Sequence, residues 1–150
     1  QHEPNSMNCY QSLATRRDSR ATGWPLRRVI WQCKSARGIL LVRYYLLQTR
    51  WLAVMLHHLR ASDDDRALHD HPWAFVTFLL SSGYYEHTPR GRFWRRRLSV
   101  LFRPAKWQHR LELVKPTWTL VVRGPYVREW GFILQGVWKD WQTYGRELCD

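Results

Sequence analysis

The segment Leu68-His69-Asp70-His71-Pro72-Trp73 is the most informative stretch of this 150-residue chain. Residues two apart on an extended strand point to the same face, so the imidazoles of His69 and His71 are expected to converge on one point. Asp70 is expected to point away and to hydrogen-bond to the backbone or to an arginine, which fixes the strand end. The charged residues 63–66 before the pair and the apolar run 73–80 after it place the histidines at the mouth of a strand.

A third histidine, His109, lies at the start of another expected strand. Two nearby histidines are more often surface residues than a metal site, so the pair alone is weak evidence. A third imidazole is more telling, because imidazole nitrogen binds several divalent transition metals. We therefore treat His69, His71 and His109 as candidate ligands of one metal ion.

The rest of the chain is typical of short strands separated by turn residues such as Ser81-Ser82-Gly83 and Gly124-Pro125. Ten tryptophans also favour sheets, because this side chain suits a half-buried pleated surface. The pattern predicts an all-β sandwich or barrel, with a short helix only within 137–148. The expected strands are 39–47, 51–59, 73–80, 84–87, 93–102, 109–114, 118–122 and 130–134.

The composition limits the kinds of domain that this chain can form. Hydrophobic residues make up 45% of the chain, which is enough for a core and excludes a wholly disordered protein. Residues 1–25 are polar, so we expect a loose or extended N-terminal arm. Residues 26–150 are expected to form a single β-barrel domain.

The formal net charge is +12, from 24 lysines and arginines against 12 aspartates and glutamates. Such a balance raises nucleic acid as a partner. Residues 90–97 mix arginines with Phe93 and Trp94, a combination that can bind single strands. The arginines are spread along the chain, however, so we favour a solvated hairpin with outward arginines and keep nucleic acid as the alternative.

The three cysteines, Cys9, Cys33 and Cys149, are far apart and form no CxxC pair. A disulfide framework or a cysteine zinc site is therefore not expected, and a reducing compartment fits better. The longest apolar run, 39–47, is interrupted by Arg43 and is much shorter than the roughly 20 residues of a membrane helix. Residues 1–20 lack the apolar segment of a signal peptide. We expect a soluble protein of the bacterial cytoplasm, or of the host cytoplasm if a phage encodes it.

The spacing of these residues resembles the two motifs of the cupin family, whose members are small jelly-roll barrels. His69, His71 and Gly83 match the first motif, and Pro104 and His109 match the second. The chain departs from the motifs at the opening glycine, the glutamate, the second glycine and the closing asparagine, which are replaced by Asp63, Val76, Lys106 and Leu113.

A closer resemblance, over about residues 39–134, is to uncharacterised small cupins of bacterial and phage genomes. It implies a fold and a metal site but no known reaction. The runs that carry it are Leu56-His57-His58, Ser62-Asp63-Asp64-Asp65-Arg66, His69-Asp70-His71-Pro72-Trp73, Gly83-Tyr84-Tyr85-Glu86, Trp118-Thr119-Leu120 and Trp130-Gly131-Phe132.

Without the motif's glutamate, three neutral imidazoles leave a divalent ion with its full +2 charge, which attracts an anionic ligand. The three-histidine set resembles the iron site of the thiol dioxygenases, which also carry the sequence found at 68–72. That resemblance implies Fe(II) and a reaction that uses dioxygen. Zinc, manganese and nickel stay open, because imidazole suits them as well.

Other residues are candidates for supporting roles. A fourth ligand, or a group that contacts a ligand, is sought among Glu86, His57 and His58. One of the two adjacent histidines must face inward, because neighbours on a strand alternate; a hydrogen-bonded core histidine and a solvated Glu86 are the plainer interpretations. The candidates for lining the pocket are Trp73, Phe75, Tyr45, Arg43 and Arg123.

Arginines on barrel strands point outward by default, and an inward one would be a candidate clamp for a carboxylate or phosphate. Two functions follow. The first is a mononuclear metal-dependent enzyme that acts on a small molecule. The second is a non-catalytic module, a ligand sensor or a phage or assembly component whose basic surface contacts nucleic acid or protein. Pairing of exposed edge strands can also form a homodimer.

Overall fold

The structure is a computed structural model that describes residues 11–14, 27–32, 39–63 and 67–147. All three cysteines and most of the predicted N-terminal arm lie outside these residues. The part of the arm that is described, Gln11–Ala14, forms strand β1, which pairs antiparallel with β2 (Arg27–Gln32).

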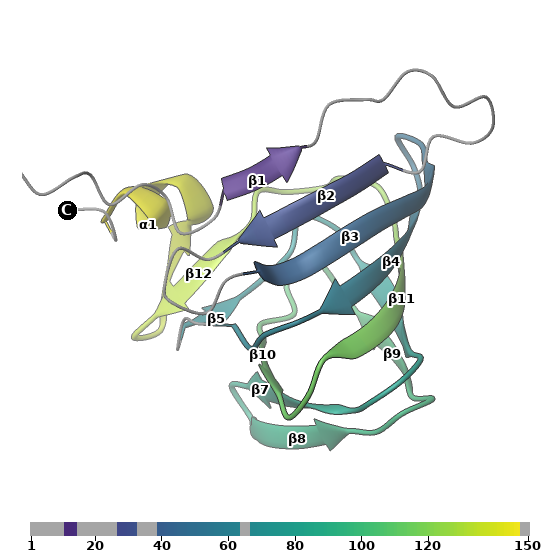
Figure 1. The fold of residues 1–150 in the computed structure, drawn as a ribbon. Helices are drawn as coiled ribbons and strands as arrows, with labels where there is room; N and C mark the ends of the chain where they lie inside the picture. The colour runs from purple at the N-terminus through teal and green to yellow at the C-terminus, as the bar shows by residue number, and fades with distance from the viewer. Residues whose placement is uncertain (1–10, 15–26, 33–38, 64–66, 148–150) are drawn as a thin grey trace, which may run out of the picture.

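The described residues form an almost entirely β structure, as the sequence predicts (Figure 1). The only helix among them is α1 (Trp141–Glu147). No helix in the described part of the chain has the length and apolar character needed to cross a membrane. The remaining strands are β3 (Ile39–Gln48), β4 (Ala53–Leu59), β5 (Leu68–His69), β6 (Phe75–Leu79), β7 (Tyr84–Thr88), β8 (Gly91–Arg95), β9 (Val100–Arg103), β10 (Arg110–Leu113), β11 (Thr117–Arg123), β12 (Gly131–Leu134) and β13 (Val137–Asp140).

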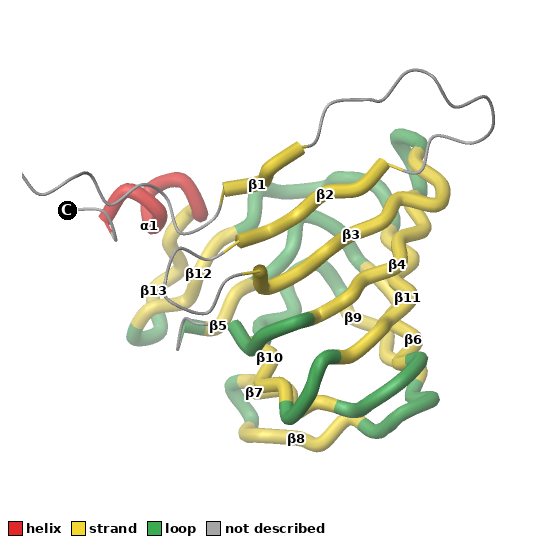
Figure 2. The backbone as a smooth tube through the Cα atoms, viewed as in Figure 1, coloured by secondary structure: helices red, strands yellow, loops and turns green. Residues whose placement is uncertain are grey.

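The strands form three antiparallel sheets. The largest has the order β1-β2-β3-β4-β11-β6-β9, and the two smaller ones have the orders β10-β7-β8 and β13-β12-β5. Figure 2 shows β2, β3, β4 and β11 side by side, with β7 and β8 at the bottom and α1 and β12 at the left. β1 to β4 follow one another in the large sheet as they do in the chain, whereas β11, β6 and β9 join it from distant parts of the sequence.

Burial alternates along the central strands β4, β6 and β11. Ala53, Met55, Phe75 and Val121 form one buried cluster on the inner side of the large sheet. Phe132, Ala67 and Tyr144, the last of them on α1, form a second buried cluster. The period of two residues therefore separates an inner from an outer face in each of these strands.

The expected strand 93–102 is wrong as a single element, because the chain leaves one sheet and joins another within it. β8 pairs with β7, whereas β9 pairs with β6 in the large sheet. The turn between them contains Leu98 at a φ of 63°. The Leu98 N–H donates to the Leu79 carbonyl and the Leu79 N–H donates to the Ser99 carbonyl, which draws the chain across.

The short helix predicted within 137–148 is present and takes up the second part of that stretch. Val137–Asp140 is strand β13, paired with β12 after the tight turn at Gly136. The helix begins at Trp141, where the Asp140 carboxylate accepts the backbone N–H groups of Gln142 and Thr143 at 2.8 and 2.9 Å. This is an N-cap, which satisfies donors that the first turn leaves unpaired.

Gly131 joins β12 closely to β13, and its replacement tests this packing. A Cβ atom at this position lies 2.1 Å from the Lys139 carbonyl oxygen, a backbone atom that cannot turn aside. We expect Gly131→Ala to lower the free energy of unfolding by about 1–3 kcal/mol, the usual cost of overpacking. Urea unfolding followed by tryptophan fluorescence measures it.

The matched control is Gly124→Ala, because a Cβ at Gly124 meets its nearest neighbour at an ordinary 3.6 Å. Its free energy of unfolding should stay within about 0.5 kcal/mol of that of the unchanged protein. Equal stability of the two variants would contradict the close packing described at Gly131.

Candidate metal centre

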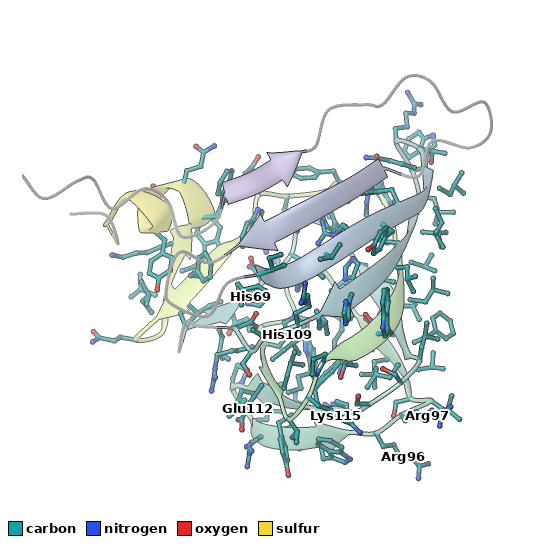
Figure 3. The ribbon with its side chains drawn as sticks, in the orientation of Figure 1. His69, Arg96, Arg97, His109, Glu112 and Lys115 are labelled. Atoms are coloured by element: carbon teal, nitrogen blue, oxygen red, sulfur yellow. The ribbon has the colours of Figure 1, made fainter. Side chains whose placement is uncertain are left out.

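The structure brings His69, His71 and His109 together. Each offers a ring nitrogen, and these nitrogens lie within 4.8 Å of one another. The Nε2 atoms of His71 and His109 are 2.8 Å apart. Two nitrogens bound at about 2.1 Å to one ion, at right angles, are about 3.0 Å apart, so this pair has the spacing of two ligands of one ion. Figure 3 shows His69 and His109 pointing into the same region.

Reciprocal backbone pairing places two of these side chains. His69 and His109 form a bridge in which each N–H donates to the other's carbonyl at 2.9 Å. The third histidine is held separately, because the His71 N–H donates to the Ala105 carbonyl at 3.0 Å. The loop before β10 thus fixes both histidines of the 69–71 segment through main-chain bonds.

Asp70 lies between the two histidines and faces away from them, as expected. Its Oδ1 accepts the Gly131 N–H at 2.8 Å, and its Oδ2 accepts the Trp138 indole N–H at 3.0 Å and a hydrogen bond from Arg128. The Asp70 carboxylate is nearly fully buried. It therefore fastens the strand end to β12 and β13, and the alternation of the strand turns its neighbours toward the opposite side.

Glu86 is not the solvated carboxylate of the plainer interpretation. It is only 1% exposed and accepts hydrogen bonds from Arg95, Arg103, Trp107 and His109. Burial alone would raise the pKa of Glu86, but the hydrogen bonds from His109 and Arg103 outweigh it and hold the pKa well below its usual range. Glu86 is therefore a carboxylate that contacts a candidate ligand.

The contact between Glu86 and His109 sets the protonation of that ring. Glu86 Oε1 lies 2.9 Å from His109 Nδ1, so the ionised carboxylate keeps the proton on Nδ1. The lone pair is left on Nε2, the nitrogen that faces His71. Metal-binding histidines commonly have a carboxylate on the second ring nitrogen in this way.

His71 is held neutral, as a metal ligand must be. Burial lowers its pKa well below the ordinary value of 6.5, and the nearby Arg43 guanidinium lowers it further. Three imidazole donors, one with an oriented tautomer, fit a borderline divalent transition ion. Among the described residues, this is the only cluster of three such groups with that spacing.

A cavity of about 230 Å³ opens beside the three histidines. Most of its wall is apolar, and its polar lining includes Arg43, His57 and Asp63. Asp63 accepts the Leu111 N–H at 2.8 Å and so supports β10. The sequence analysis did not assign this supporting role to Asp63. The one pattern that marked the residue was its position in the first motif, where the motif has a glycine.

Arg43 points inward, contrary to the default for strand arginines. The strand register aligns it with His57, and its Nε–H donates to His57 Nε2 at 3.0 Å. Burial and the neighbouring Arg43 lower the His57 pKa well below 6.5, so this ring accepts the bond in its neutral form. Arg43 also donates to the Tyr45 hydroxyl at 3.3 Å. The guanidinium thus brings a fixed positive charge to the cavity wall.

The other candidates divide between the two sides of the sheet. Trp73 and Phe75 line the cavity, and the Phe75 ring centroid is 4.6 Å from that of His71. Tyr45 packs against the inner cluster without lining the cavity. Arg123 also lies outside the lining, with its guanidinium over Trp73. His58 is on the outer face, stacked on Trp118 at 4.2 Å.

The basic segment 90–97 is only in part the solvated hairpin that the sequence suggested. Arg90, Arg96 and Arg97 are exposed. Arg95 instead turns toward Glu86, and Arg92 pairs with Glu112 at 2.7 Å. Sequence reasoning also missed Arg103, whose one signal was a lone charge at the end of the apolar run 98–102.

The chain matches no protein-family model and no curated protein sequence. Its fold, however, is similar to that of a cupin superfamily protein from Desulfitobacterium hafniense, with 12% identity, a TM-score of 0.50, and coverage of 57% of this chain and 77% of the other. The polyketide cyclase RemF from Streptomyces resistomycificus gives 13% identity, a TM-score of 0.55, and coverage of 71% and 79%. The Fe(II) form of HppE has 13% identity and a TM-score of 0.53, and the match covers 75% of this chain and 64% of HppE. At these identities the likeness establishes the fold.

The contact between Glu86 and His109 predicts the effect of Glu86→Gln. The amide has one acceptor oxygen in place of two and cannot hold the His109 tautomer as a carboxylate does. We expect metal affinity to fall by about 10–100-fold, as for other residues that orient a ligand. Competition with a chromophoric chelator, using Co²⁺ or Zn²⁺, measures the affinity.

Glu112→Gln is the matched control. This substitution removes the same charge as Glu86→Gln. Glu112 also bonds to a histidine and an arginine, His87 at 2.5 Å and Arg92 at 2.7 Å, but it lies away from the three candidate ligands. Its variant should bind metal as the unchanged protein does. A normal affinity in Glu86→Gln, with its circular dichroism intact, would show that the carboxylate does not orient the ligand.

Proposed function

From the cupin fold and the convergence of His69, His71 and His109, we propose that this protein is a mononuclear metal-dependent enzyme acting on a small anionic molecule. The observation that carries the proposal is the cavity: three imidazole donors lie on its wall, and the Arg43 guanidinium lies on the same wall. A metal ion and an anionic substrate thus have separate places within one small space.

The set of donors favours an open metal centre. A structural zinc site is closed by four protein ligands, whereas a catalytic site keeps a position for substrate. The described cluster has three members. Of the two carboxylates beside it, Glu86 is engaged by four side chains, and Asp63, 4.0 Å from His69 Nδ1, accepts the Leu111 N–H. This arrangement supports catalysis over the alternative of a non-catalytic module.

Fe(II) is the metal we favour, from the likeness of the three-histidine set to thiol dioxygenases and of the fold to HppE, which was solved in its Fe(II) form. When bound, a divalent ion supplies Lewis-acid chemistry and, if it is iron, redox chemistry with dioxygen. Zinc, manganese and nickel are compatible with the same donors.

The chain's own residues prepare the reaction. Arg43 attracts and orients the anionic group of the substrate, and its bond to neutral His57 limits its freedom. Phe75 and Trp73 form apolar wall beside His71, which suits an apolar portion of the substrate and keeps water from the reacting group. The expected substrate is therefore a small carboxylate or phosphate with an apolar body.

Metal binding is tested with His109→Ala, in protein purified without added metal. We expect the unchanged protein to carry about one equivalent of a transition metal by mass spectrometry, and the variant to lose it, because two imidazoles hold the ion poorly. Loaded with Fe(II), the unchanged protein should consume dioxygen when small thiols or carboxylates are supplied, and the variant should not.

His58→Ala serves as the control, because it also removes an imidazole but from the outer face. It should retain the metal. Stoichiometric metal in His109→Ala would remove His109 from the ligand set. Metal binding without dioxygen uptake by the Fe(II)-loaded protein would contradict the dioxygen-using reaction.

The place of the anion is tested with Arg43→Gln in the Co²⁺-loaded protein. Addition of a small carboxylate such as acetate should change the Co²⁺ absorption spectrum, and the variant should need about 10–100-fold more of it, since a charged hydrogen bond contributes about 1.5–3 kcal/mol. Arg50→Gln, in the exposed turn between β3 and β4, should behave as the unchanged protein. Equal titrations in all three proteins would exclude Arg43 as the anion clamp.

A further inference from the structure

The small sheet β10-β7-β8 presents aromatic and basic side chains on its outer side. Burial alternates along β7, where Tyr84 and Glu86 are buried and Tyr85 and His87 are only partly buried. Residues that lie opposite each other on antiparallel strands share a face. The outward residues of the sheet are therefore Arg110 and Glu112 on β10, Tyr85 and His87 on β7, and Arg92 and Trp94 on β8. We call these six residues the basic aromatic face.

The rings of this face are held in fixed positions and are accessible. Trp94 is 49% exposed, and its ring centroid lies 4.9 Å from that of Tyr85 in a T-shaped contact. The Trp94 ring also packs on Gly83, where a Cβ atom would lie only 2.5 Å from it. The Arg92 guanidinium lies 3.5 Å over the Tyr85 ring. An ordered indole and an ordered guanidinium plane are both surfaces on which a nucleobase stacks.

Cations without acidic partners surround these rings. Residues 84–97 and 106–115 contain eight lysines and arginines against two glutamates, and one glutamate is the buried Glu86. The other, Glu112, is bonded to His87 and Arg92. Four of the cations make no ion pair within the described part of the chain: Arg90, Arg96, Arg110 and Lys115. Figure 3 shows Arg96 and Lys115 at the same lower end of the molecule as Glu112. Such a surface attracts a polyanion.

A pocket of about 180 Å³ continues this surface at the tip of the hairpin between β7 and β8. Its lining includes Arg90 from the tip, and Lys106 and Trp107 from the loop before β10. Strand register brings the two segments together, because Arg110 lies opposite His87 and the residues before Arg110 therefore run beside the tip. Two cations and an aromatic ring are the groups that bind a phosphate and the base next to it.

We propose that the basic aromatic face binds single-stranded nucleic acid. Bases stack on Trp94 and on the Arg92 guanidinium, and the cations without acidic partners bind the phosphates. Proteins that bind single strands combine a positive track with aromatic platforms, and a sheet with aromatic residues on adjacent strands is one form of such a platform. The sequence alone favoured a solvated hairpin. The ordered rings and the unpaired cations around them are what the tertiary structure adds.

The geometry favours a single strand over other anionic partners. A duplex keeps the faces of its bases stacked on one another, so it can use the cations but not the rings. An anionic membrane requires apolar side chains that insert together, but Phe93 and Trp94 are adjacent on β8 and point to opposite sides of the strand. An acidic peptide supplies carboxylates for the arginines but no regular series of planar rings.

The stacking contact is tested with Trp94→Ala, by fluorescence anisotropy of a labelled oligodeoxythymidylate in about 50 mM salt. We expect the unchanged protein to bind the strand, and the variant to bind it at least about 5-fold more weakly, the usual loss for one stacked base. The variant should bind a duplex as the unchanged protein does, because a duplex does not use the ring. An unchanged circular dichroism spectrum shows that the variant is folded.

The phosphate contacts are tested with Arg96→Gln and Lys115→Gln in one variant. Both side chains are exposed, so their replacement carries little risk to folding. We expect the plot of log affinity against log salt concentration to become shallower by about 1.4, which is about 0.7 for each lost phosphate contact on a single strand. An unchanged slope would remove these two cations from the phosphate path and contradict the proposal.

Trp51→Ala is the matched control for Trp94→Ala. Trp51 is 61% exposed and has the Arg50 guanidinium 4.3 Å from its ring centroid, but it lies in the turn between β3 and β4, far from β8 (Figure 1). This variant should bind the strand as the unchanged protein does. The proposal is overturned if the unchanged protein does not bind the strand, or if the two tryptophan variants have equal affinity. Binding to phosphatidylserine vesicles that Trp94→Ala abolishes, with its affinity for the strand unchanged, would assign the face to a membrane surface instead.

Discussion

The buried carboxylate of Glu86 is the constraint on which the candidate site depends. An ion taken out of water costs several kcal/mol unless its hydrogen bonds are replaced. Here Arg95 on β8, Arg103 on β9, and Trp107 and His109 in the loop before β10 replace them. One charge on β7 therefore ties together a small sheet, the edge of the large sheet and the loop that carries His109. The group that joins the sheets also fixes a candidate ligand's tautomer.

Main-chain pairing completes this arrangement. The bridge between His69 and His109 joins segments that are far apart in the chain, and Asp70 fastens the same segment to β12 and β13 from the other side. The candidate ligands are thus held by main-chain hydrogen bonds and by two buried carboxylates, not by exposed, flexible side chains. A site built on such supports is preorganised, so the protein needs little further ordering when a metal ion binds.

The period of two residues gives the central strands two separate surfaces. On β4, Met55 and His57 face the cavity, whereas Val54 and Leu56 point to the opposite side of the sheet. The cavity side combines apolar wall with a few placed polar groups, as ligand pockets do. On the opposite side, β4 presents Val54 and Leu56 and then His58, which stacks on Trp118.

The sequence by itself was sufficient for the all-β class, for the convergence of His69 and His71 and for the outward turn of Asp70, because these follow from local alternation along a strand. It pointed to His109 only through spacing and resemblance. The inward Arg43, the burial of Glu86 and the division of 93–102 between two sheets were decided by tertiary structure. Each depends on which distant segment lies opposite: His57 for Arg43, Arg103 for Glu86, and β6 for β9. Strand register over such distances sets which charges meet and which face is buried, and no local pattern encodes it.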